Sequence, residues 1–183
     1  MKPTQILMLA IAGAVLGALV GVGWQQWQEH YGDSAARHGA ELSRLPAFSY
    51  PGLDGSVQDS TQWAGRTLVL NFWATWCPPC REETPLFVEL QETYGAAGVQ
   101  FVGIAIDDLQ PTQDFADTYG VNYPILIGDS SAIELSRKLG NRFEGLPYTV
   151  IAAPDGKVTL RHMGGLEREQ IEPELQRLTA PKP

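Results

Sequence analysis

The hydrophobic pattern begins with a long apolar run near the amino terminus. Residues 6–22 are seventeen consecutive apolar or glycine residues. A helix of this length rises about 25 Å, close to the thickness of the hydrocarbon core of a bilayer. The run is followed by Trp24 and Trp27. Indole rings prefer the membrane interface, so these two residues extend the segment into that zone. The run therefore predicts one transmembrane helix within an anchor that covers residues 1–28.

The flanks of this run indicate its orientation. Lys2 and the terminal amine place positive charge before the run, which predicts that the amino terminus stays in the cytoplasm and that the rest lies outside. A cleaved signal peptide is the alternative. Because Gly21-Val22-Gly23 is followed by the bulky Trp24, the cleavage site would be poor, and an uncleaved anchor is favoured.

After the anchor, residues 29–44 are polar without a sustained period, which predicts a tether, and residues 45–180 show an α/β alternation. The predicted strands cover residues 47–50, 67–72, 99–106, 124–127, 148–152 and 157–161. The predicted helices cover residues 82–94, 112–119, 132–139 and 167–178. Strands that alternate with helices and end in a hairpin and a final helix predict a mixed central sheet with helices on both faces.

Charge narrows the range of partners. The chain has 183 residues, with 21 acidic and 13 basic side chains and a formal net charge of −8. No cluster of Lys or Arg could follow a phosphate backbone, so nucleic acid is not a predicted partner.

The candidate chemistry lies in the only two cysteines, Cys77 and Cys80. A disulfide that closes so small a loop removes little entropy from the unfolded chain, so its value must lie in being formed and broken. A zinc site needs about three or four ligands, and the histidines His30, His38 and His162 are scattered along the chain. No metal site is therefore predicted.

The position of Cys77 favours a reactive thiolate. It stands at the opening of a predicted helix, where free amide groups and the helix dipole stabilise negative charge. Pro78 and Pro79 have no amide hydrogen, so the nearest donors are the backbone groups of Cys80 and Arg81. We therefore expect Cys77 to attack a substrate disulfide and Cys80 to resolve the mixed disulfide.

The stretch from Asn71 to Glu83, N-F-W-A-T-W-C-P-P-C-R-E-E, resembles the active site of the TlpA/ResA family. The resemblance extends over residues 45–178 and includes an extra strand and helix at residues 121–139. It implies a thioredoxin-like fold and an extracytoplasmic thiol:disulfide reductase, held on the bacterial inner membrane by residues 6–22, with the domain on the periplasmic side.

The resemblance also implies partners. Oxidised cysteine pairs of exported proteins would be the substrates, with apocytochrome c as the most family-like example. A thiol carrier in the membrane would regenerate the reduced pair. No cofactor is implied beyond the Cys77 and Cys80 disulfide.

The resemblance assigns a further residue to the site, Pro147 in Gly145-Leu146-Pro147-Tyr148-Thr149. Thioredoxin-like proteins have a cis-proline there that faces the active-site sulfurs, whereas bond statistics alone would favour a trans proline. Asn71 stands where cytosolic thioredoxins carry a buried Asp, and an amide cannot exchange a proton at physiological pH.

Glu83 is the candidate proton acceptor for Cys80. It shares a helical face with Leu86, Leu90 and Tyr94, which predicts that it points inward, and burial would raise its pKa. Members of the family that this chain resembles use a Glu here in that role. A Glu held by a nearby Arg, or one that caps the helix, is the alternative.

The predicted substrate contacts are Trp76, Pro78 and Leu146. Trp76 is expected to be exposed and to form an apolar wall, whereas Trp73 is expected to lie in the core. Asp107 and Asp108 follow a predicted strand, but an acidic pair that enters a loop is usually solvated, so neither is predicted to be catalytic.

Two other functions compete with the reductase. A thiol peroxidase of the thioredoxin superfamily would need a Pro-x-x-x-Thr-x-x pattern before its cysteine, and aromatic residues precede Cys77 instead. A copper-delivery module of the same fold would need cysteines three residues apart and a companion histidine, for which only His162 is a candidate. The sequence does not fix the direction of electron flow.

Overall fold

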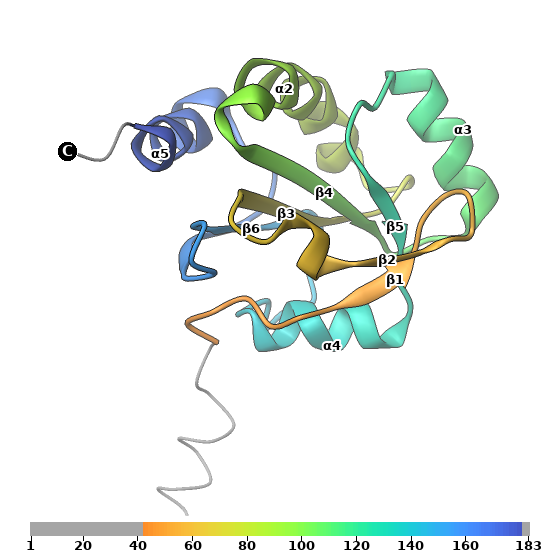
Figure 1. Cartoon of the computed structure of the whole chain (residues 1–183). Coiled ribbons are helices and arrows are strands. Elements are labelled where there is room, and N and C mark those ends of the chain that lie inside the picture. Colours follow the sequence, from red (N-terminus) through yellow and green to blue (C-terminus); the bar gives the residue numbers. More distant parts are fainter. Residues whose placement is uncertain (1–41, 181–183) are drawn as a thin grey trace, which may run out of the picture. The chain divides into compact units, whose positions relative to one another are not determined.

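The computed structural model describes residues 42–180, which form a five-stranded mixed sheet with helices on both faces (Figure 1). The strand order is β5-β4-β3-β6-β7, in which β3, β4 and β5 are parallel, whereas β6 is antiparallel to β3 and to β7. The five strands are β3 (Thr67–Trp73), β4 (Val99–Ala105), β5 (Ile125–Ile127), β6 (Tyr148–Ala152) and β7 (Val158–Met163). The predicted mixed sheet is confirmed.

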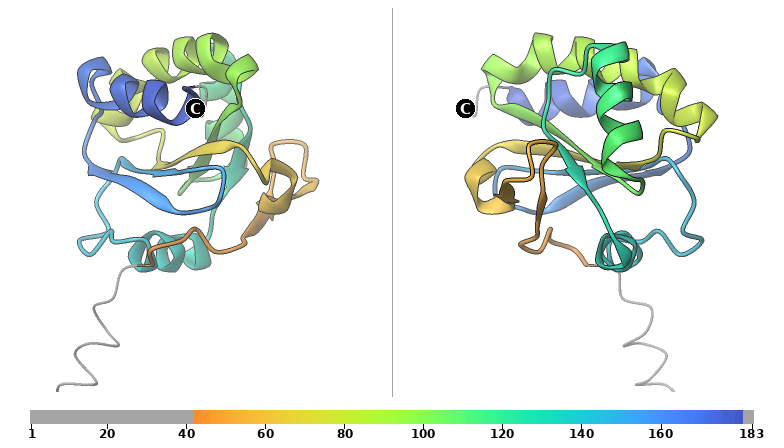
Figure 2. Two further views of the ribbon diagram at one scale, coloured as in Figure 1. Left: turned by 60° about the vertical axis from the view of Figure 1, so that its left-hand side comes forward. Right: turned by 90° about the vertical axis from the view of Figure 1, so that its right-hand side faces the viewer.

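Helices cover the sheet in two layers. The helices α2 (Pro78–Tyr94), α3 (Leu109–Tyr119) and α5 (Arg168–Thr179) lie on one face (Figures 1 and 2). The helix α4 (Ser130–Lys138) lies on the other, together with the hairpin of β1 (Ser49–Pro51) and β2 (Val57–Asp59). Two short 3-10 helices complete the described elements: η1 (Ser60–Trp63) and η2 (Gly95–Ala97).

The alternation of side chains along β3 explains the two layers. All seven of its residues are buried, as expected for a central strand covered on both faces. Leu68, Leu70 and Phe72 pack in the cluster that includes α4, whereas Val69 packs with residues of α2 and α5. Asn71 is on the same side of the strand as Val69, so it faces α2.

The start of α2 differs from the sequence prediction. The helix begins at Pro78 and not at residue 82, with Cys77 as its N-cap. Proline is compatible with the first turn of a helix, because the amide groups there have no intrahelical acceptor. The predicted range started four residues late, but the expected position of Cys77 at the opening of the helix is confirmed.

The extra strand and helix expected within residues 121–139 are present as β5 and α4.

The described chain already contacts the rest of the domain at its first residues: Leu42 N donates to Lys138 O (3.0 Å), and Ser43 O accepts from Val158 N (2.9 Å). The predicted anchor at residues 1–28 and nearly all of the tether lie outside the described residues. Within residues 42–180, no helix combines the length and the hydropathy that a membrane span requires.

Candidate active site

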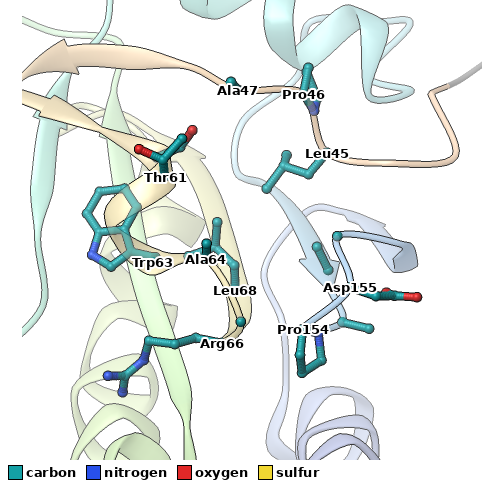
Figure 3. Close-up of a pocket in the computed structure, with 15 residues that line it drawn as sticks. Leu45, Pro46, Ala47, Thr61, Trp63, Ala64, Arg66, Leu68, Pro154 and Asp155 are labelled. Carbon is teal, nitrogen blue, oxygen red and sulfur yellow. The ribbon is translucent and has the colours of Figure 1, made fainter.

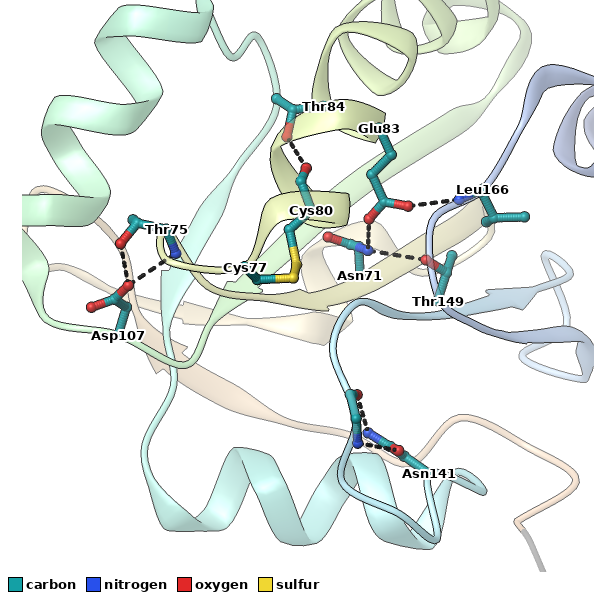
Figure 4. The surroundings of a disulfide bond; sticks show 11 residues. Asn71, Thr75, Cys77, Cys80, Glu83, Thr84, Asp107, Asn141, Thr149 and Leu166 are labelled. Carbon is teal, nitrogen blue, oxygen red and sulfur yellow. Dashed lines mark hydrogen bonds between the residues drawn. A yellow bond between two sulfur atoms is a disulfide. The ribbon is translucent and has the colours of Figure 1, made fainter.

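The two cysteines lie where β3 gives way to α2 and form a disulfide with a Cα–Cα distance of 5.3 Å (Figure 4). Cys77 N donates to Ala74 O (3.2 Å), and Cys77 O accepts from Arg81 N (3.3 Å), so the turn leads directly into the helix. Cys77 is 3% exposed and Cys80 is 1% exposed. Both cysteines are therefore nearly closed to solvent in the disulfide state.

Glu83 lies one helical turn after Cys80 and points inward, as the helical period predicts. Its side chain is buried, with Oε1 accepting from Asn71 Nδ2 (2.9 Å) and Oε2 accepting from the backbone N–H of Leu166 (2.9 Å) (Figure 4). Burial raises the pKa of Glu83, hydrogen bonds from Leu166 and Asn71 partly oppose this, and the result is a pKa of about 7. The predicted rise in pKa is confirmed, and the carboxyl can gain or lose a proton near neutral pH.

A second polar residue holds Asn71 from the opposite side. Asn71 Nδ2 also donates to Thr149 Oγ1 (3.0 Å), and the two residues are directly opposite each other in the antiparallel pair of β3 and β6. Thr149 is completely buried. Sequence reasoning missed Thr149, because its partner becomes evident only once β6 is paired with β3 in this register.

Pro147 precedes β6, and the Leu146–Pro147 peptide bond is cis, as the family resemblance implies. Pro147 is buried, and its carbonyl accepts from Gly164 N (2.9 Å). Leu146 is half-buried and packs against the apolar cluster that contains Cys77 and Cys80. The segment before β6 therefore belongs to the surroundings of the disulfide.

Asp107 also supports the site, contrary to the expectation that it would simply be solvated. Its Oδ2 accepts from the backbone N–H (2.9 Å) and the hydroxyl (2.5 Å) of Thr75, and its Oδ1 accepts from Asp108 N (2.9 Å). Burial raises the pKa of Asp107, but the hydrogen bonds from Thr75 and Asp108 outweigh it and leave the pKa below its ordinary value. Asp107 is thus a fixed anion that anchors the loop before Cys77.

The two tryptophans near the cysteines, Trp73 and Trp76, differ in burial as predicted. Trp76 is 66% exposed, whereas Trp73 is 4% exposed and packs on Phe115 with ring centroids 4.5 Å apart. Pro78 is exposed at the start of α2. The contacts of Trp76, Pro78 and Leu146 with a substrate stay a prediction.

Ligands for a metal do not gather in the described part of the chain. Among residues 42–180, no three side chains of His, Cys, Asp or Glu are close enough to hold an ion. His162 lies with Nε2 3.2 Å from the carbonyl oxygen of Gly165.

A separate cleft of about 240 Å³ has Trp63 and Leu68 on one wall and Leu45 and Pro154 on the other (Figure 3). It contains no cysteine. The hydroxyl groups on its wall are engaged locally: Ser60 Oγ accepts from Phe48 N (2.9 Å), and Thr61 Oγ1 donates to Asp59 Oδ1 (2.6 Å). Because the cleft contains no cysteine and its hydroxyl groups are already bonded, the disulfide is the candidate active site.

Comparison with known proteins agrees with this geometry. The family model described as Redoxin matches residues 40–178. Thioredoxin-like protein YneN of Bacillus subtilis is 32% identical over 170 residues, covering 90% of this chain and 95% of the relative. Thiol-disulfide oxidoreductase ResA of Bacillus anthracis is 29% identical over 181 residues, covering 98% and 99% of the two chains.

Solved structures show the same fold. A thiol:disulfide interchange protein of the thioredoxin family from Chlorobium tepidum TLS superposes with a TM-score of 0.70 at 28% identity, covering 77% of this chain and 99% of that one. A protein from Chlorobium tepidum described as a putative thiol:disulfide interchange protein DsbE gives a TM-score of 0.65, also at 28% identity, covering 76% and 96% of the two chains. The chain therefore belongs to the redoxin family, and within it to the thiol-disulfide oxidoreductases that carry a Cys-x-x-Cys pair.

Proposed function

We propose that this oxidoreductase works as a reductase of disulfides in exported proteins, on the outer side of a bacterial inner membrane. The observation that supports the exchange chemistry is the Cys77–Cys80 pair with the buried carboxyl of Glu83, whose pKa is about 7, one helical turn from Cys80. In the reductive direction Cys80 must lose its proton while it is buried. Glu83 is the group with the right pKa and burial to accept that proton.

The proposed reaction has two exchange steps. The Cys77 thiolate attacks one sulfur of the substrate disulfide, which forms a mixed disulfide and releases the first substrate thiolate, and this thiolate takes a proton from water. Cys80 then transfers its proton to Glu83 and attacks the Cys77 sulfur, which releases the second substrate thiolate, and Glu83 passes its proton on to it. The substrate gains two electrons and two protons, and the protein is left with the Cys77–Cys80 disulfide.

Neighbouring residues would guide the substrate to Cys77. The exposed ring of Trp76 and the exposed Pro78 form one side of the site, and Leu146 and Pro147 form the other. A polypeptide that lies between them would bring its disulfide against Cys77. The role of each of these residues is part of the proposal.

The amino-terminal run supports the proposed location of the catalytic domain. Residues 6–22 would anchor the chain in the membrane and hold the catalytic domain near a membrane protein that carries thiol electrons outward. Apocytochrome c, with its paired cysteines, is the proposed substrate. The relative named ResA is a thiol-disulfide oxidoreductase of similar length, which supports the same class of reaction here.

The reduction potential of the Cys77–Cys80 pair tests the direction of electron flow. The full chain in detergent is equilibrated with glutathione or dithiothreitol buffers, and the reduced fraction is measured by alkylation. A potential near that of thioredoxin, about −270 mV, is expected for a reductase. A potential near about −120 mV would make the protein an oxidant and would refute the proposed direction.

Trapping of mixed disulfides tests the partners. The Cys80→Ala variant cannot resolve the mixed disulfide, so partners should stay bound to Cys77. We expect a cytochrome precursor and a membrane thiol carrier among the trapped proteins. Recovery of neither would count against a role in cytochrome c maturation while leaving the reductase activity itself open to the potential measurement.

A further inference from the structure

Exposed apolar side chains gather at the disulfide end of the sheet. In the described part of the chain, the large hydrophobic residues that are exposed are Val57 (70%), Trp76 (66%), Leu109 (44%), Phe143 (89%) and Met163 (42%). Four of these five lie near the site: Trp76 adjoins Cys77, Leu109 starts the helix after Asp107, Phe143 lies in the connection to Pro147, and Met163 pairs with Tyr148 across β6 and β7. Val57 lies in the β1–β2 hairpin and is the exception.

Phe143 is the most exposed of these residues and lies in a loop that hydrogen bonds of Asn141 close. Asn141 is 1% exposed, and its side-chain amide forms two hydrogen bonds with the backbone of Gly145: Nδ2 donates to the carbonyl (3.0 Å) and Oδ1 accepts from the N–H (3.1 Å). The intervening Glu144 has a positive φ of 52°, an uncommon conformation for a residue other than glycine. The hydrogen bonds of Asn141 close the loop at its base, and the ring of Phe143 within it is in solvent, where it contributes nothing to the core.

The loop is close enough to the disulfide to touch a bound polypeptide. Leu146 packs against the cluster that contains both cysteines, and three residues of chain span at most about 11 Å, which limits the separation of Phe143 from Leu146. In Figure 2, the cyan connection from α4 to β6 and the yellow-green start of α2 lie on the same side of the molecule. An extended peptide advances about 3.3 Å per residue, so about three residues of substrate cover the stretch from Leu146 to Phe143.

We propose that Phe143 is a specificity contact for an extended segment of the substrate that carries an apolar side chain a few residues from its reactive cysteine. This inference rests on the proposed function. A substrate whose cysteine reaches Cys77 must run its flanking residues over this end of the domain. When an apolar side chain covers the ring of Phe143, both apolar surfaces are removed from water, which favours binding. A polar side chain at the same place gains no such free energy. The contact selects among polypeptide disulfides and takes no part in the exchange itself.

Two matched peptides and three variants test the contact. Each peptide contains one disulfide, with either leucine or serine at the third position on both sides of the reactive cysteine. The reduced full chain in detergent is mixed with each peptide, and kcat/KM is measured for the wild type, Phe143→Ser, Phe143→Leu and Val57→Ser. Hydroxyethyl disulfide, which has no flanking residues, measures the reactivity of Cys77 alone.

We expect the wild type to prefer the leucine peptide by about tenfold, as is typical for one apolar group in a specificity site. Phe143→Ser should lose that preference, Phe143→Leu should retain most of it, and Val57→Ser should match the wild type. All four proteins should reduce hydroxyethyl disulfide at the same rate. An active wild type whose preference survives in Phe143→Ser would overturn this inference alone, whereas a wild type that reduces none of the disulfides would overturn the proposed function.

Discussion

Two carboxylates support the disulfide from two different elements, and their environments differ. Glu83 lies on α2, is 4% exposed and receives one hydrogen bond on each oxygen. Asp107 lies beyond the end of β4, is half-exposed and receives three hydrogen bonds, two of them from Thr75. Burial dominates the first and raises its pKa to about 7, whereas hydrogen bonding dominates the second and lowers its pKa.

The difference assigns separate tasks to two groups of the same chemistry. A carboxyl with a pKa near 7 is protonated in about half of the molecules at neutral pH, so it can accept or donate a proton at little cost. Asp107 is ionised at every pH at which the protein would work, so it cannot exchange protons but can hold the Thr75 loop in place. The predictions below are arranged from the largest expected effect to the smallest.

The largest effect is on the pH dependence of stability. Because folded Glu83 has a raised pKa, its contribution to stability is fully present below pH 4.5 and is lost as the pH rises to about 7. The wild type should thereby lose about 3 kcal/mol of unfolding free energy over this range, and Glu83→Gln should lose much less. Urea unfolding at pH 5 and pH 8 measures the difference between the two proteins.

The exposed neighbour Glu82 supplies the control for this comparison. Glu82→Gln should keep the pH dependence of the wild type, because only a buried carboxyl pays the cost of ionisation in the folded state. Equal pH slopes for Glu83→Gln and the wild type would contradict the raised pKa of Glu83.

Removal of the second carboxylate should cost stability at every pH near neutral. Asp107→Ala leaves two groups of Thr75 without their acceptor, which should lower the unfolding free energy by about 2 kcal/mol. The cost should be the same at pH 5 and pH 8, since Asp107 is ionised throughout. Asp108→Ala is the control, because the exposed side chain of Asp108 does not cap α3. A cost for Asp107→Ala that changes between pH 5 and pH 8 would remove the distinction between the two carboxylates.

The role of Glu83 can be predicted from the sequence, whereas the role of Asp107 cannot. Glu83 could be identified because its burial follows from positions within one helix, where the period of Leu86, Leu90 and Tyr94 fixes the inward face. Asp107 depends on the parallel pairing of β3 with β4, in which Trp73 is opposite Ala105. Two residues beyond that pair, Thr75 and Asp107 meet.

The same distinction applies to the fold. The alternation of apolar runs and amphipathic segments predicts the central strands and the order of the helices, because both periods are local. It does not predict register, so the contact between Asn71 and Thr149 could not be anticipated from either strand alone. Nor does it predict the shape of the loop in which Asn141 binds the backbone of Gly145.

A carboxyl introduced at residue 71 tests the contact between this position and Glu83. Asn71 Nδ2 lies 2.9 Å from Glu83 Oε1, so Asn71→Asp would place two carboxyls in contact, and both cannot ionise at once. The pair should titrate in two steps, with the upper apparent pKa at least about one pH unit, or about 1.4 kcal/mol, above that of Glu83 in the wild type. NMR titration of the carboxyl carbons measures both steps.

The double variant Asn71→Asp with Glu83→Gln controls for the new group. It should titrate in a single step, because only one carboxyl remains beside the disulfide. If the Asn71→Asp variant alone also titrated in a single step near pH 7, the two side chains would not be in contact.

The smallest effect is expected from Thr75→Val, which removes the hydroxyl that donates to Asp107 but keeps the backbone N–H bond. The pKa of Asp107 should rise toward its ordinary value, and the unfolding free energy at pH 7 should fall by about 1 kcal/mol. A lowered pKa contributes stability above pH 3.8 that is lost as the pH falls through the folded pKa, so the deficit should shrink in acid. Thr75→Ser keeps the hydroxyl and should behave as the wild type. A deficit of equal size in neutral and strongly acidic solution would mean that the methyl group that replaces the hydroxyl disturbs the packing around residue 75, and that the bond to the anion does not stabilise the loop.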